Sequence, residues 1–179
     1  PYLNDIFDYS CMNEAIMLTS RGCPYHCIYC YTPHAFKHKI TFHSIDRVME
    51  EIERVIEKGV KRLWFADPNI SCKPNRLIEI FDRILTQGIE VKMWVQTRVD
   101  LVTPELMKMM KRAGVGVIAF GLESASDRVL TKLGKKINTE QVAEAIRMTQ
   151  DQGIEVELFT LFGLPYETFE DAMKTLEEA

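Results

Sequence analysis

The amino-acid sequence predicts an α/β fold in which strands and helices alternate around a parallel sheet. Apolar residues alternate between a strand-like and a helical spacing along most of the chain, which is typical of repeated strand–helix units. The chain has 179 residues, 46% hydrophobic and 27% charged, which suits one domain with a sizeable core. Five such units imply right-handed crossovers, and we predict part of a barrel rather than a flat doubly wound sheet, a prediction that rests partly on the motifs in the loops after the strands.

The first half of the chain supports three strands and two helices. The strands are expected at residues 15–19, 60–66 and 89–96. Ser44 is predicted to cap a helix whose apolar residues recur at helical spacing until Gly59 ends it. A second helix is expected over 74–87, because it starts at a proline and is followed by a glycine.

The second half repeats this alternation. Thr103 and Pro104 predict the start of a third helix, a cap followed by proline in the first turn, and that helix ends near Gly114. A strand at 115–120 follows. The remaining segments are expected to be a helix at 138–152, a strand at 154–162 and a helix at 165–179.

Three cysteines lie within eight residues directly after the first predicted strand: Cys23, Cys27 and Cys30. The spacing Cys-x3-Cys-x2-Cys lets one irregular loop hold three corners of a four-iron cube and leaves the fourth iron open. Ordinary buried cysteines are one alternative. The other is a structural zinc site, completed by His26, His34 or Cys72.

The loops after the second and third predicted strands also carry polar side chains. In a parallel sheet, such loops gather at the carboxyl ends of the strands. Asp67 and Asn69 are suited to hold a ligand ammonium group, and a capping turn for the next helix is the alternative. Arg98 is suited to a two-pronged contact with a ligand carboxylate, and an ion pair with Asp100 is the alternative.

The loops after the fourth and fifth predicted strands are suited to a nucleoside. Glu123 is suited to accept hydrogen bonds from a ribose diol. The alternative is that Glu123 and Ser124 cap a short helix. Gly163 permits close approach of the backbone to a flat ring, and Pro165 stiffens the turn after Leu164. The alternative is a plain strand-to-helix turn.

Two further features have less specific interpretations. The basic segment from His34 to His43 is most simply a solvated loop, with an anionic substrate as the alternative. Cys72 lies on a strand-end loop, where a lone cysteine is more often inert than catalytic.

Charge and cysteine usage limit the classes of partner and compartment. A net charge of −4 gives no overall basic field, which disfavours nucleic acid and favours a small or locally recognised substrate. The longest apolar run, 115–122, is too short to cross a bilayer. Five cysteines with three bunched in one loop suit a reducing compartment, so we expect the cytoplasm.

Three motifs occur in order after successive predicted strands: the cysteine loop, Gly-Leu-Glu-Ser at 121–124 and Gly-Leu-Pro-x-Glu-Thr at 163–168. Together they resemble the catalytic core of the radical S-adenosylmethionine (SAM) superfamily over residues 15–179. The resemblance implies a partial (β/α)6 TIM-like barrel, of which about five of six units are present here, and the barrel prediction rests partly on it. It also implies that residues 1–14 link this core to a preceding domain and that the core is truncated at its carboxyl end.

The resemblance implies two cofactors, a [4Fe-4S] cluster and SAM. Cys23, Cys27 and Cys30 would bind the cluster, and SAM would chelate the open iron. No catalytic residue is assigned. The SAM contacts implied are Tyr29 on the adenine, Asp67 and Asn69 on the ammonium, Arg98 on the carboxylate, Glu123 and Ser124 on the ribose, and Gly163, Leu164 and Pro165 near the adenine.

The implied activity is reductive cleavage of SAM, with an electron from an external low-potential donor, to start methyl transfer or rearrangement on an unknown substrate. Three segments are most similar to the cobalamin-binding subgroup: the opening Pro1-Tyr2-Leu3, the Arg-Gly-Cys-Pro loop and the Gly-Leu-Glu-Ser-Ala-Ser loop. In that subgroup, cobalamin would bind a domain absent from this chain. A methylthiotransferase-like enzyme is the alternative within the superfamily. Outside it, the alternatives are a zinc-stabilised binding domain and an electron-transfer module whose fourth ligand is Cys11 or Cys72.

Overall fold

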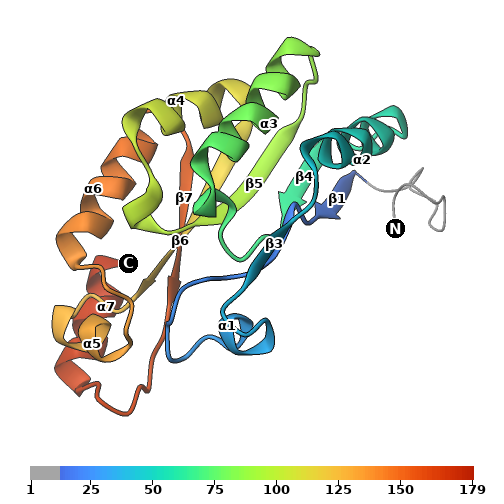
Figure 1. Cartoon of the computed structure of the whole chain (residues 1–179). Coiled ribbons are helices and arrows are strands. Elements are labelled where there is room, and N and C mark those ends of the chain that lie inside the picture. The colour runs from blue at the N-terminus through green and yellow to red at the C-terminus, as the bar shows by residue number, and fades with distance from the viewer. Residues whose placement is uncertain (1–12) are drawn as a thin grey trace.

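The computed structural model describes residues 13–179, and its main feature is one parallel sheet of five strands (Figure 1). The strands follow chain order across the sheet, so the chain winds in one direction, whereas a doubly wound sheet reverses its order. This confirms the predicted α/β fold with five parallel strands. In order, they are β1 (Glu14–Met17), β4 (Arg62–Phe65), β5 (Lys92–Thr97), β6 (Val115–Glu123) and β7 (Glu155–Thr160).

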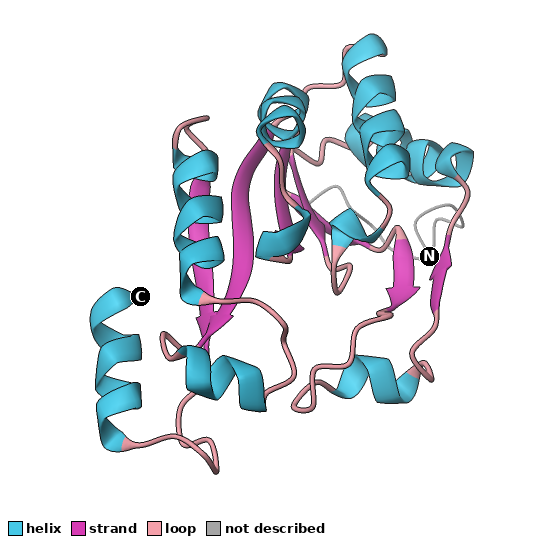
Figure 2. Ribbon diagram, turned by 60° about the vertical axis from the view of Figure 1, so that its left-hand side comes forward, coloured by secondary structure: helices cyan, strands magenta, loops and turns pink. Residues whose placement is uncertain are grey.

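Four helices pack against one face of this sheet, as Figure 2 shows. They are α2 (Ile45–Glu57), α3 (Pro74–Thr86), α4 (Pro104–Ala113) and α6 (Thr139–Gln150). The other elements are α1 (Tyr31–Ala35), α5 (Asp127–Lys132), α7 (Phe169–Glu178) and the 3-10 turns η2 (Ile70–Cys72) and η3 (Val99–Leu101). No helix within residues 13–179 combines the length and the apolar character that crossing a membrane requires.

Side-chain caps fix where the outer helices begin. Ser44 and Thr103 accept hydrogen bonds from backbone N–H groups three residues further on, at 3.3 and 3.2 Å. Asn138 forms a reciprocal capping box with Gln141 at the start of α6. Each cap contributes about 1 kcal/mol to stability, and the predicted starts of α2 and α4 are confirmed.

The last helix begins later than expected. The sequence predicts a helix from residue 165, whereas α7 starts at Phe169, because Thr168 caps it and accepts a hydrogen bond from the Asp171 N–H. The preceding residues form a turn with Gly163 at φ 76°. Proline at 165 is therefore part of the connection, not the first helical turn.

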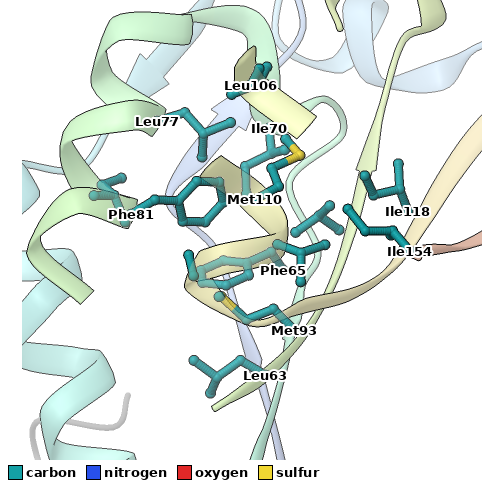
Figure 3. Close-up of a cluster of buried hydrophobic side chains, with 14 of the residues drawn as sticks. Leu63, Phe65, Ile70, Leu77, Phe81, Met93, Leu106, Met110, Ile118 and Ile154 are labelled. Atoms are coloured by element: carbon teal, nitrogen blue, oxygen red, sulfur yellow. The ribbon is translucent and has the colours of Figure 1, made fainter. Parts of the chain in front are cut away.

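The core lies between the sheet and the four outer helices (Figure 3). Alternate residues of β4 point into it, so Leu63 and Phe65 are buried while Trp64 is 45% exposed on the opposite face. Phe81 from α3 and Met110 from α4 are fully buried beside them. Burying each such side chain contributes about 1.5–3 kcal/mol, and this packing holds the carboxyl ends of the strands in place.

A small antiparallel hairpin is absent from the sequence prediction. β2 (Ser20–Gly22) pairs with β3 (Ile40–Phe42), with Ser20 opposite Phe42. Gly22 has φ 89°, and a Cβ there would lie 2.1 Å from the Lys39 carbonyl oxygen. The hairpin therefore closes the cysteine loop at its base. Of the proposed linker 1–14, only residues 13 and 14 are described, and Cys11 lies outside the described residues.

Candidate functional site

A cavity of about 240 Å3 lies at the carboxyl ends of the strands, where the cysteine loop meets the ends of β5 and β6. Ligand-binding sites of parallel α/β folds lie at this edge. The sequence-predicted residues that line the cavity are Cys23, Cys27, Tyr29, Cys30, Asn69, Arg98 and Glu123. Residues from distant parts of the chain are thus brought to one place.

The three cysteines face this cavity together. Cys23 and Cys27 are buried, and Cys30 is half-buried at the start of α1. Among residues 13–179, no group of three or more His, Cys, Asp or Glu side chains is arranged to hold a single metal ion. A four-iron cube does not require such convergence, because each of its thiolates binds a different iron. The donor set and its shared cavity therefore fit a cluster held by three thiolates.

The cysteine environment favours thiolate at one position. A hydrogen bond from the Cys72 thiol lowers the pKa of Cys23 to about 6, with a further contribution from the Arg98 charge, although burial opposes the shift. Burial instead raises the pKa of Cys27, and the Arg98 charge opposes that shift. Cys72 thus contacts the cysteine loop, a placement that its sequence position alone does not reveal.

A buried ion pair lies beside the cysteines. Glu123 accepts hydrogen bonds at the same oxygen, Oε1, from Lys135 Nζ at 2.7 Å and from the Tyr29 hydroxyl at 2.9 Å. The side chains of Lys135 and Glu123 are only 4% and 9% exposed. Burial lowers the pKa of Lys135 against the effect of Glu123, and burial together with the Glu123 charge raises the pKa of Tyr29. Tyr29 is therefore a neutral phenol that donates to a carboxylate.

The carboxylate of Asp67 points away from the cavity. It is fully buried and accepts hydrogen bonds from the Thr19 backbone and hydroxyl, both at 2.9 Å, and from the Ser20 hydroxyl at 2.5 Å. Asn69 does line the cavity, where its Oδ1 accepts from Thr97 at 2.9 Å. The Asn69 Nδ2 is buried and has no hydrogen-bond partner among the described residues. Asp67 thus anchors the entry to the cysteine loop, and Asn69 has an unpaired donor.

Ser124 and the 163–165 turn do not line this cavity. The Ser124 hydroxyl accepts from the Ser126 N–H at 3.2 Å at the start of α5. The N–H groups of Gly163 and Leu164 donate to Glu167 Oε2 at 2.6 and 3.3 Å. The turn considered as an alternative at 163–165 is therefore present, whereas α5 begins after Ser126 without a side-chain cap from Glu123 or Ser124. Contacts of these residues with a cofactor stay predictions.

Several cavity residues are missing from the sequence prediction, among them Lys135 and Phe159. Lys135 stands in Leu-Gly-Lys-Lys, where a lysine has no local signal that distinguishes it from a solvated one. Phe159 is apolar and lies on β7, where residues alternate between faces, so its place in the predicted strand could have revealed it.

Comparison with known proteins identifies the family. The family model described as Radical SAM superfamily matches residues 17–179. The chain therefore belongs to the radical SAM superfamily, whose members use a [4Fe-4S] cluster and SAM.

Two curated relatives and one solved structure illustrate the similarity. An uncharacterized methyltransferase of Pyrococcus horikoshii is 32% identical over 165 residues, which cover 92% of this chain and 36% of that protein. The anaerobic magnesium-protoporphyrin IX monomethyl ester cyclase of Cereibacter sphaeroides is 31% identical over 180 residues, covering 98% of this chain and 29% of that protein.

The structure is that of the radical SAM methyltransferase TsrM from Kitasatospora setae, with tryptophan and a SAM analogue bound. Its TM-score is 0.86 at 20% identity, and the match covers 95% of this chain and 34% of TsrM. This likeness concerns the fold. The chain spans only about a third of the length of these proteins.

Proposed function

We propose that residues 15–179 are the catalytic core of a radical SAM enzyme that starts methyl transfer or rearrangement on a small-molecule substrate. The observation that carries the proposal is the shared cavity, which collects three cysteines, Asn69 and the buried carboxylate of Glu123 at the carboxyl ends of the strands. When bound, the reduced cluster supplies the electron that cleaves SAM into methionine and a 5'-deoxyadenosyl radical.

Each side chain of the cavity has a distinct role in this proposal. Cys23, Cys27 and Cys30 hold the cluster. Glu123 accepts ribose hydroxyls at Oε2, because Oε1 already accepts from Lys135 and Tyr29. Asn69 donates its unpaired Nδ2 to an acceptor of SAM.

Apolar side chains also line the cavity. Phe159 and Ala119 line it beside the polar groups, and the ring of Tyr29 forms another part of its wall. Apolar walls strengthen the electrostatic contacts within a site and protect a reactive species from side reactions. In this proposal, the side chains of the cavity bind and orient SAM and shield the reactive species.

The names of the relatives support the class of reaction. One is described as a methyltransferase and another as a cyclase, and the solved structure is of a methyltransferase. We therefore place the substrate among small molecules and leave cobalamin, bound outside residues 15–179, as part of the same proposal. An external low-potential electron donor and a reducing compartment, the cytoplasm, complete it, with residues 1–14 as a linker to a further domain.

Anaerobic reconstitution of the intact protein with iron and sulfide tests the proposal. The expected result is a [4Fe-4S] spectrum and, after reduction with SAM present, formation of 5'-deoxyadenosine or methylated product measured by mass spectrometry. Cys27→Ala should remove the cluster absorbance, whereas Cys72→Ala should keep it. A cluster-loaded protein that forms neither product would refute the proposal, and a methylthio product would favour the methylthiotransferase alternative.

A further inference from the structure

Arg98 is held in the cavity wall by contacts that use three of its five N–H groups. The residue is 9% exposed. Its Nε donates to Asp100 Oδ1 at 2.9 Å, and its Nη2 donates to Asp100 Oδ2 at 3.0 Å and to the Lys135 carbonyl oxygen at 2.8 Å. Guanidinium has five N–H groups, so the two on Nη1 are what remains.

The remaining nitrogen faces the cysteine loop. Arg98 Nη1 lies 3.8 Å from Cys27 Sγ, within hydrogen-bonding distance for sulfur. The guanidinium carbon lies 4.1 Å from the centre of the Tyr25 ring, which belongs to the same loop. Arg98 thus pairs with Asp100 along one edge and directs Nη1 at the sulfur of Cys27.

This geometry disfavours a two-pronged contact with a carboxylate ligand. Such a contact needs two parallel N–H groups of one edge, and the Nε–Nη2 edge is already paired with Asp100. A cation with one N–H aimed at sulfur suits a different role. Hydrogen bonds to the sulfurs and local charge set the reduction potential of an iron–sulfur cluster.

We propose that Arg98 is a positioning residue for the cluster, which raises its reduction potential through the charge and the N–H···S contact to Cys27. The inference rests on the proposed function, since it requires Cys27 to bind the cluster. The step concerned is a one-electron reduction of the cluster from the 2+ to the 1+ state by an external low-potential donor. A positive charge beside the sulfur favours the state that carries the extra electron. Asp100 fixes the position of the guanidinium, and the Tyr25 ring contacts its other side at 4.1 Å from ring centre to guanidinium carbon.

The test is a redox titration of the cluster-loaded intact protein without SAM, followed by electron paramagnetic resonance. Arg98→Gln removes the cation, and we expect reduction to become about tenfold less favourable, which is about 59 mV for a one-electron couple. Arg98→Lys keeps a charge but lacks the fork, and its potential should lie between those of Arg98→Gln and the parent protein. Arg83→Gln is the matched control, because Arg83 is an exposed cation that pairs with Asp46 on the outer helices.

The affinity for SAM separates this role from the carboxylate contact. We expect the dissociation constant of SAM to be unchanged in Arg98→Lys, measured by calorimetry on oxidised protein. A potential equal to that of the Arg83→Gln control in both Arg98 variants would overturn the inference, as would failure of both variants to retain a cluster. Failure of the parent protein to bind a cluster would instead refute the proposed function.

Discussion

Replacing Lys135 by methionine measures how strongly the buried ion pair of the cavity stabilises the fold. The methionine keeps most of the side-chain volume but leaves the buried Glu123 carboxylate with the Tyr29 hydroxyl, at 2.9 Å, as its remaining side-chain donor among the described residues. Removing one partner of a buried pair typically costs about 3–5 kcal/mol, because the other charge stays desolvated. Since Tyr29 still donates to Glu123, we expect the lower end of that range, about 3 kcal/mol.

Urea denaturation of the cluster-free protein, followed by circular dichroism, measures this change. In a domain of this size, about 3 kcal/mol corresponds to a fall in melting temperature of about 6–12 °C. Lys132→Met is the control, because Lys132 is exposed on α5 and the same charge is removed. Adding Glu123→Gln to Lys135→Met should recover much of the loss, since no buried charge is then left unpaired. A loss below about 1 kcal/mol would show that the pair behaves as a solvated surface pair and would refute the reasoning.

Two further substitutions test how the site is supported. Gly114→Ala should cost about 2 kcal/mol or more in thermal unfolding, because Gly114 has φ 105° and a Cβ there would lie 2.1 Å from the Val91 carbonyl oxygen. The control is Gly59→Ala, with φ 90° and no atom within 4 Å, which should cost only about 1 kcal/mol; equal losses would contradict the clash. Asp67→Ala should destabilise the cluster-free chain by at least about 3 kcal/mol in urea, because three buried donors lose their acceptor. Exposed Asp82→Ala is its control, and an effect seen only in SAM affinity would instead favour the predicted ammonium contact.

The sequence was informative wherever the signal is local. The outer helices begin at side-chain caps such as Ser44 and Thr103, and glycine ends α4 at Gly114, so their bounds follow from residues a few positions apart. The parallel strands follow from apolar runs between helices. These are the features for which hydrophobic periodicity and capping chemistry suffice.

The rest depends on residues that are far apart in the sequence. Strands β2 and β3 have three residues each, too few to show a period, and they exist because they pair with each other. Lys135 is buried because Glu123 lies 2.7 Å away. Asp67 looked like a ligand contact, yet its carboxylate faces Thr19 behind the loop. The position of a polar residue at a strand end predicts the edge of the sheet, but not the direction of its side chain.

The β2–β3 hairpin has a consequence for how a cofactor enters the protein. Its two strands hold the ends of the cysteine loop together, with Gly22 opposite Ile40. Bringing the ends of a flexible loop together has an entropic cost that grows with loop length. Because the hairpin already holds these ends together, cluster binding does not incur this cost. Insertion of a cluster would therefore order only the interior of the loop, so the affinity for iron and sulfide should depend on the integrity of the hairpin as well as on the three cysteines.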